Sequence, residues 1–213
     1  MTLDSQNKKW VYANEETPHY DLVVSLGTDH HPYDRAVEWV NAYLKKHPEV
    51  TCFFQHGFTS DSRYATENAH ILPRAEMLKL YEKSSVAIVH GGPGCILDVR
   101  AAGRMPLTMP RRPWLGEHVD EHQVRFTKVM DEQGEAILVH DQEDFERKLD
   151  AAIGNPAVYA ADYRVSGADE ASDKLEAALQ PILREKSFHP VRFVRRWGQV
   201  IDGVIKERRS KDS

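Results

Sequence analysis

A short apolar run, a glycine-rich turn and a helix-like stretch follow one another in this chain and most constrain its fold. Residues 86–89 are rich in β-branched side chains, which is typical of a buried parallel strand. They are followed by His90, Gly91, Gly92, Pro93, Gly94 and Cys95, and a helical pattern then covers residues 96–102. Glycines let backbone N–H groups reach the positive end of the next helix, so this pattern predicts an anion site and a phosphate-bearing ligand.

Apolar runs and helical patterns alternate along most of the chain. Strands are predicted at residues 21–27, 50–57, 86–89, 106–110 and 135–139, and helices at 33–47, 74–83, 96–102, 119–130 and 143–153. Residues 58–72 are predicted to form a long loop. Strand–helix alternation with short connections predicts an α/β fold, a Rossmann-like doubly wound parallel sheet with right-handed crossovers.

The composition indicates a soluble globular protein. Its 213 residues carry a net charge of -5, which argues against a nucleic-acid partner. Cys52 and Cys95 lie in or beside predicted strands and indicate a reducing compartment instead of a disulfide framework. No apolar run approaches the ~18 residues of a transmembrane span, and the first residues lack the apolar stretch of a signal peptide, so the expected location is cytoplasmic.

The pattern divides the chain into three parts. We expect an N-terminal extension at 1–20, a Rossmann-like domain at 21–185 that includes a helix at 168–183, and a basic amphipathic helix within 186–213. The last part is rich in Lys and Arg and carries an apolar stripe of Val194, Trp197, Ile201, Val204 and Ile205. Such a helix can dock on an anionic membrane or a partner, or it can pack the stripe on its own core.

Polar residues follow two of the predicted strands. Asp98 lies one helical turn beyond Gly94, where its carboxylate can accept hydrogen bonds from ligand hydroxyls. Residues 116–123, Gly-Glu-His-Val-Asp-Glu-His-Gln, come after the strand at 106–110. Because ligands bind outside the carboxyl ends of parallel strands, both groups are expected to converge on one crevice.

Two other kinds of site match parts of this pattern. Residues 92–97 nearly match the nicotinamide-binding G-x-G-x-x-G, but Leu97 occupies the third glycine position. Residues 118–122 match H-x-x-E-H, in which two histidines bind zinc and Glu121 would act as a base. The sequence identifies no third ligand, and His118 is close enough to Gly116 to precede the helix. We therefore expect no bound metal and no cofactor.

Four motifs, taken in order, resemble the C-terminal domain of family 28 glycosyltransferases. They are residues 24–28 (Val-Ser-Leu-Gly-Thr), 55–57 (Gln-His-Gly), 90–94 and 116–123, within a resemblance that covers about residues 22–153. The pattern is particularly similar to small bacterial exopolysaccharide glycosyltransferase subunits, which are similar to the catalytic subunit of the dolichol-linked N-acetylglucosaminyl transferase. The resemblance implies the C-terminal, donor-binding half of a GT-B glycosyltransferase and a nucleotide-sugar substrate, most often a UDP-sugar.

The resemblance also implies roles for single residues. Gly27 and Thr28 would face the diphosphate, residues 91–95 would donate backbone N–H groups to the phosphates, and Asp98 would hold the ribose. His122 and Gln123 match residues that contact the sugar. The family usually has Glu at the position of Asp98, and Ser or Thr at that of Cys95. The other expected donor-site residues are His30, Gln55, His90, Pro93, Arg111, Glu117 and His118, of which Gln55 could instead cap loop backbone.

A GT-B enzyme has two such domains, and we expect this chain to hold only the donor half. A membrane-associated partner subunit would then supply the acceptor half, and the chain would work peripherally at the inner face of the cell membrane. The expected reaction is an inverting transfer to a lipid-linked acceptor in polysaccharide biosynthesis. The base commonly comes from the acceptor half, and His118 is the local candidate. A non-catalytic module that binds a nucleotide-sugar is the alternative.

Overall fold

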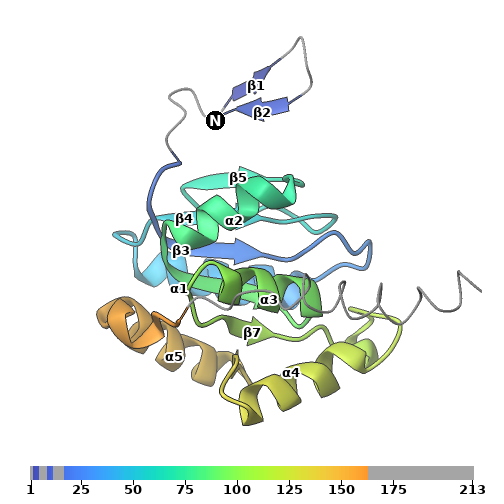
Figure 1. Ribbon diagram of the computed structural model, residues 1–213. Coiled ribbons are helices and arrows are strands. Elements are labelled where there is room, and N and C mark those ends of the chain that lie inside the picture. The colour runs from blue at the N-terminus through green and yellow to red at the C-terminus, as the bar shows by residue number, and fades with distance from the viewer. Residues whose placement is uncertain (1, 5–8, 12–16, 163–213) are drawn as a thin grey trace, which may run out of the picture. The chain divides into compact units, whose positions relative to one another are not determined.

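The computed structural model describes residues 2–4, 9–11 and 17–162 (Figure 1). Near the N-terminus, β1 (Thr2–Asp4) pairs antiparallel with β2 (Lys9–Val11). The predicted helices at 168–183 and in 186–213, with the apolar stripe, lie outside the described residues. Within those ranges, no helix is both long enough and apolar enough to cross a membrane.

Six parallel strands form the central sheet, as the alternation of strands and helices predicts. They are β3 (Tyr20–Ser25), β4 (Cys52–Gln55), β5 (Glu67–Ala69), β6 (Ser84–His90), β7 (Leu107–Met109) and β8 (Ile137–Leu138). Their order is β5-β4-β3-β6-β7-β8, which is the 3-2-1-4-5-6 order of a doubly wound dinucleotide-binding sheet. The order changes direction between β3 and β6, so these two neighbours mark the place where a ligand is expected.

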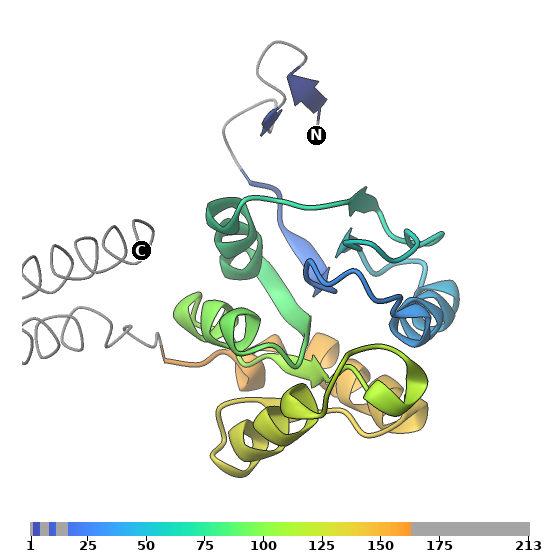
Figure 2. The ribbon, with the colours of Figure 1, turned by 90° about the vertical axis from the view of Figure 1, so that its right-hand side faces the viewer.

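Helices cover both faces of this sheet, because its strands send side chains alternately to either side. Val86 and Ile88 of β6 join one apolar cluster with α1 (Asp34–Lys46) and α5 (Gln142–Gly154). Ala87 and Val89 join the other with α2 (Arg74–Glu82), α3 (Pro93–Ala101) and α4 (His122–Glu132). Figure 2 shows α1 on one side of the sheet and α2 and α3 on the other. The 3-10 helices η1 (Pro113–Leu115) and η2 (Pro156–Tyr159) complete the described elements.

Two predicted boundaries are wrong. The predicted loop at 58–72 contains β5, an edge strand that pairs with β4 although Glu67-Asn68-Ala69 has no apolar pattern to reveal it. The helix expected from 119 begins only at His122. Gly116 adopts a left-handed φ of 72°, and the Asp120 carboxylate accepts the His122 N–H at 2.9 Å, so the chain turns before the helix starts. His118 therefore precedes α4.

Candidate functional site

A cleft of about 490 Å³ opens at the carboxyl ends of β3 and β6. Predicted donor-site residues on its wall are Gly27, Thr28, Gln55, His90, Gly92, Pro93, Gly94, Cys95 and Asp98. Residues that the motifs did not single out also line it, namely Ser25, Asp29, Ile71, Leu72, Arg74, Met77 and Tyr81. The fold thus brings the end of β3 and the glycine loop, which are far apart in sequence, to one cavity at the expected place.

The imidazole of His90 packs between the two glycine turns of the cleft. A Cβ built on either Gly27 or Gly92 would lie far inside van der Waals contact of this ring, and Gly27 has a left-handed φ of 76°. Gly92 is therefore required for space, and Gly27 is required for both space and backbone conformation. The ring in turn fixes how closely the two loops approach.

His90 is a neutral side chain near neutral pH. Burial, reinforced by the charge of Arg111, lowers the pKa of His90 from 6.5 to about 4. Its Nδ1 accepts the Gly92 N–H at 3.1 Å, which assigns the ring proton to Nε2, 3.1 Å from Cys95 Sγ. Burial also raises the pKa of the Cys95 thiol, to about 12, which disfavours its nucleophilic thiolate form.

The N-terminus of α3 faces the cleft with unpaired backbone donors. Gly92 is the N-cap and Pro93 the first helical residue, which has no N–H to satisfy. The N–H groups of Gly94 and Cys95 are too near the start of the helix for an intrahelical partner, and the space around the Gly94 Cα is open. Such donors, together with the helix dipole, form an anion site.

Gln55 uses its side chain to fasten the loops beside the cleft. Its Oε1 accepts from Ser25 Oγ at 2.7 Å and from Gly27 N at 3.2 Å. Its Nε2 donates to the carbonyls of Gly27 at 2.9 Å and His70 at 2.8 Å. The amide is buried and fully bonded, so its position matches the loop-capping alternative.

Asp98 is held by an arginine that sequence reasoning missed. Arg74, the first residue of α2, donates through Nε and Nη2 to the Asp98 carboxylate at 2.6–3.0 Å. It is the one Lys or Arg among the residues that line the cleft. Its location after a predicted loop gave no signal, because pairing with Asp98 depends on the adjacent packing of α2 and α3.

Arg111, in the loop after β7, keeps its charge inside the protein. Arg111 is only 1% exposed, and its guanidinium donates to the carbonyls of Leu26 at 2.9 Å, His31 at 2.7 Å and Glu117 at 3.1 Å. The same group lies over the Tyr33 ring, 4.6 Å from its centroid. Arg111 does not line the cleft; it ties the loop after β3 to the loop after β7.

Glu117 and Gln123 also face inward. The Glu117 carboxylate accepts from Arg35 Nε and Nη2, both at 2.9 Å, and from Arg112 N at 2.8 Å. The buried Gln123 Oε1 accepts from Arg111 N at 3.3 Å. Neither side chain lines the cleft, and both brace the β7 loop behind it.

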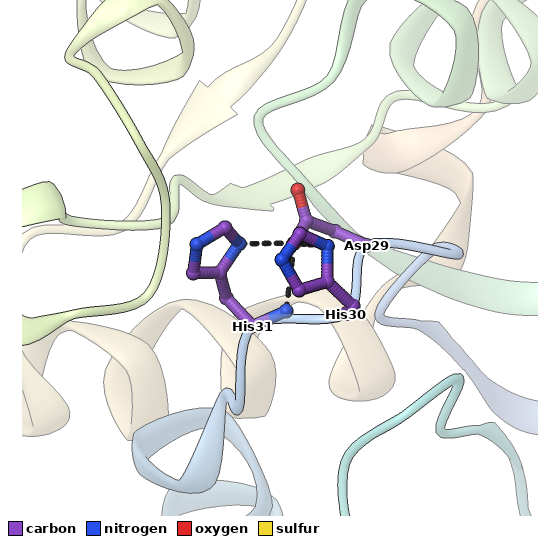
Figure 3. A group of neighbouring side chains, drawn as sticks. All are labelled: Asp29, His30 and His31. Carbon is purple, nitrogen blue, oxygen red and sulfur yellow. Dashed lines mark hydrogen bonds and ion pairs between the residues drawn. The ribbon is translucent and has the colours of Figure 1, made fainter.

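Histidines and aspartates gather where the loops after β3 and β7 meet. Asp29, His30 and His31 lie together, with the His31 N–H and ring donating to Asp29 Oδ1 (Figure 3). Asp29 Oδ2 is 3.4 Å from His118 Nε2. His118 is joined by Asp120 and His122, whose metal-ligating atoms and its own lie within 4.8 Å of one another. Asp29 was missed by the sequence analysis, since only the folded loops bring it to His118.

Comparison with protein families gives a match that covers most of the chain. The glycosyltransferase family 28 C-terminal domain matches residues 33–178. No curated protein matches.

Solved structures match the fold. The calicheamicin glycosyltransferase CalG4 superposes with a TM-score of 0.53 at 17% identity, over 82% of this chain and 46% of that one. The glycotransferase of kitacinnamycin superposes with a TM-score of 0.49 at 15% identity, over 74% of this chain and 40% of that one. Medicago truncatula UGT71G1 complexed with UDP-glucose superposes with a TM-score of 0.46 at 16% identity, over 64% of this chain and 32% of that one. The chain spans less than half the length of each. The CalG4 match shows that the sheet is that of the C-terminal half of GT-B glycosyltransferases.

Proposed function

This chain belongs to the glycosyltransferase family 28 C-terminal domain family, and we propose that it binds a nucleotide-sugar in the cleft between β3 and β6. The nucleotide-sugar that we propose is a UDP-sugar. The observation that carries this proposal is the convergence of the glycine loop, the end of β3 and Asp98 on one cavity at the switch point of the sheet.

The chemistry of the cleft fits the parts of such a donor. The N–H groups of Gly94 and Cys95 suit a diphosphate at the start of α3. Ile71, Leu72 and Met77 form an apolar wall that suits the flat face of a base. The family resemblance assigns the ribose to Asp98 and the sugar to His122 and Gln123. Neither of the last two side chains lines the cleft, and Gln123 is buried behind it.

The Asp98 side chain is one methylene shorter than the family's glutamate, and its pairing with Arg74 holds this shorter side chain in place. The bidentate pair fixes the Asp98 carboxylate at the cleft wall before any ligand arrives. A fixed acceptor costs less conformational entropy on binding than a free one. Arg74 also supplies positive charge near the diphosphate.

We propose further that a second polypeptide completes the enzyme. An inverting transfer requires the acceptor hydroxyl, a base and the donor in one cleft, and bringing them together accounts for several kcal/mol of the barrier. The expected partner is membrane-associated and carries the acceptor half, and the expected acceptor is lipid-linked. His118 is the local candidate for the base. Sugar transfer by this chain alone at enzymatic rates would contradict the two-part enzyme.

The test is calorimetric titration of the full chain with UDP, UDP-sugars and NADH. We expect UDP binding and no NADH binding. Asp98→Ala should weaken UDP binding by about 1.5–3 kcal/mol, because it removes a hydrogen bond to a charged group. Asp61→Asn, an exposed residue beside a different cavity, is the control and should leave the UDP affinity unchanged. NADH binding without UDP binding would contradict the proposal.

A further inference from the structure

Sequence reasoning set aside a metal site at residues 118–122 because it found no third ligand. In the structure Glu121, the expected base, turns away and pairs with Arg125 at 2.9 Å. Asp120 takes its place between the two histidines. Its Oδ1 is 3.5 Å from His118 Nδ1 and contacts His122 Nδ1 directly. Asp120 is therefore a candidate for the third ligand that the sequence did not identify.

We propose that His118, Asp120 and His122 bind one divalent transition-metal cation of the Zn²⁺ class, with Asp29 as the outer carboxylate that orients His118. The ligand atoms of the three residues lie within 4.8 Å of one another and come from the turn before α4 and the first residue of that helix. Two imidazoles and a carboxylate are the donor set that zinc uses, with a fourth position left for water or substrate. This inference goes beyond the proposed nucleotide-sugar binding and does not depend on it. When the cation is bound, His118 is a ligand and is no longer the local candidate for the base.

The outer contacts match what a metal-bound histidine requires. Ligating histidines donate their second ring N–H to a carboxylate or carbonyl, which fixes ring orientation and raises ligand basicity. His118 directs Nε2 toward Asp29 Oδ2 at 3.4 Å. Its Nδ1 is 3.5 Å from Asp120 Oδ1 and accepts the Asp120 backbone N–H at 3.2 Å, a hydrogen bond that a cation at Nδ1 would replace. Asp29 is itself held by the His31 N–H at 2.8 Å and the His31 ring at 2.6 Å. The His118 side chain is only 8% exposed, so its ring is held by packing before a cation binds.

The charges of the cluster also suit a divalent cation. Asp120 contributes one negative charge as a ligand and Asp29 another behind His118, which together balance the cation. The His31 N–H and ring donate to Asp29, and the His122 N–H donates to Asp120, so both carboxylates are held in place. Imidazole ligands favour Zn²⁺, Co²⁺ or Ni²⁺ over Mg²⁺ or Ca²⁺.

Coordination through both Nδ1 atoms leaves the His122 Nε2–H free. That donor remains available for a sugar hydroxyl, so metal binding and the family role of His122 are compatible. The cation would stiffen the turn before α4, which presents His122 and Gln123.

The test uses the full chain without a histidine tag, freed of metal by chelation. Co²⁺ titration followed by visible absorption reports coordination geometry, and Zn²⁺ calorimetry reports affinity. We expect one equivalent of each, a tetrahedral Co²⁺ spectrum and no displacement by equimolar Mg²⁺. His122→Ala, at a half-exposed position, should abolish stoichiometric binding without unfolding the chain. Asp29→Asn should weaken Zn²⁺ binding about 10–100-fold, the usual effect of an outer carboxylate.

The matched control is His47→Gln. His47 also lies between two carboxylates, Glu49 at 3.3 Å and Asp150 at 3.8 Å, but no second imidazole is among these partners. This variant should bind Zn²⁺ as the unsubstituted chain does. No stoichiometric Co²⁺ binding, or binding that survives His122→Ala, would overturn the inference. UDP titration of the chelated chain tests the nucleotide proposal separately.

Discussion

The two halves of the carboxyl edge are built in opposite ways. Between β3 and β6, glycine turns leave backbone donors at Gly94 and Cys95 open to a cleft. Beyond β7, the charged groups of Arg111 and Glu117 form hydrogen bonds with neighbouring protein groups, and both residues are almost fully buried. Both halves carry polar residues after a strand, so their sequences look alike. A polar strand end therefore becomes an anion-binding surface only where the fold leaves its backbone donors unpaired.

The buried ion pair behind β7 provides the largest expected effect. Glu117→Ala should lower the free energy of unfolding by about 3–5 kcal/mol, because the Arg35 guanidinium, only 12% exposed, loses its carboxylate partner. Urea denaturation measures the loss. The control is Glu146→Ala, which breaks the more exposed pair with Lys46 and should cost less than about 1 kcal/mol. Equal losses would mean that the β7 half is no more structural than the surface.

His90 should make stability depend on pH in one window. The folded-state pKa of about 4 lies below 6.5, so the unfolded chain binds the proton first. Stability should be complete above pH 6.5 and fall by up to about 3 kcal/mol as pH drops toward 4, at about 1.4 kcal/mol per pKa unit. His90→Gln should flatten this part of a urea-derived stability profile. An unchanged profile would exclude a buried neutral imidazole between the glycine turns.

The glycines of the β6 loop should not be equivalent. Gly92→Ala drives a Cβ into the His90 ring and should cost about 1–3 kcal/mol of stability. Gly94→Ala meets open space inside a helix and should be neutral or slightly stabilising. Thermal unfolding of the two variants measures both effects. Equal destabilisation would show that the turns are not fixed by contact with His90.

The sequence was sufficient for the sheet and the glycine loop, because buried strands and glycine turns are local patterns. It was insufficient for β5, whose Glu67-Asn68-Ala69 is a strand only because β4 offers a free edge. It did not reveal the buried protein partners of Arg111 and Glu117, because charge after a strand does not show what the side chain will contact. The contact of Arg74 with Asp98 joins two helices and that of Asp29 with His118 joins two loops, and a pattern along the chain does not encode either.

Chemical-shift mapping of UDP binding tests the central claim most directly. Backbone amides of the isotope-labelled full chain are followed while UDP is added. The account predicts that the largest shifts fall at Gly94 and Cys95, with smaller ones at Gly27 and Thr28. The structure offers an internal alternative, a second cavity of about 500 Å³ between α1 and the loop after β4, lined by Asp34, Val37, Glu38, Asn41, Ser60, Asp61, Arg63 and Tyr64. Shifts concentrated there, with the glycine loop unmoved, would contradict the account.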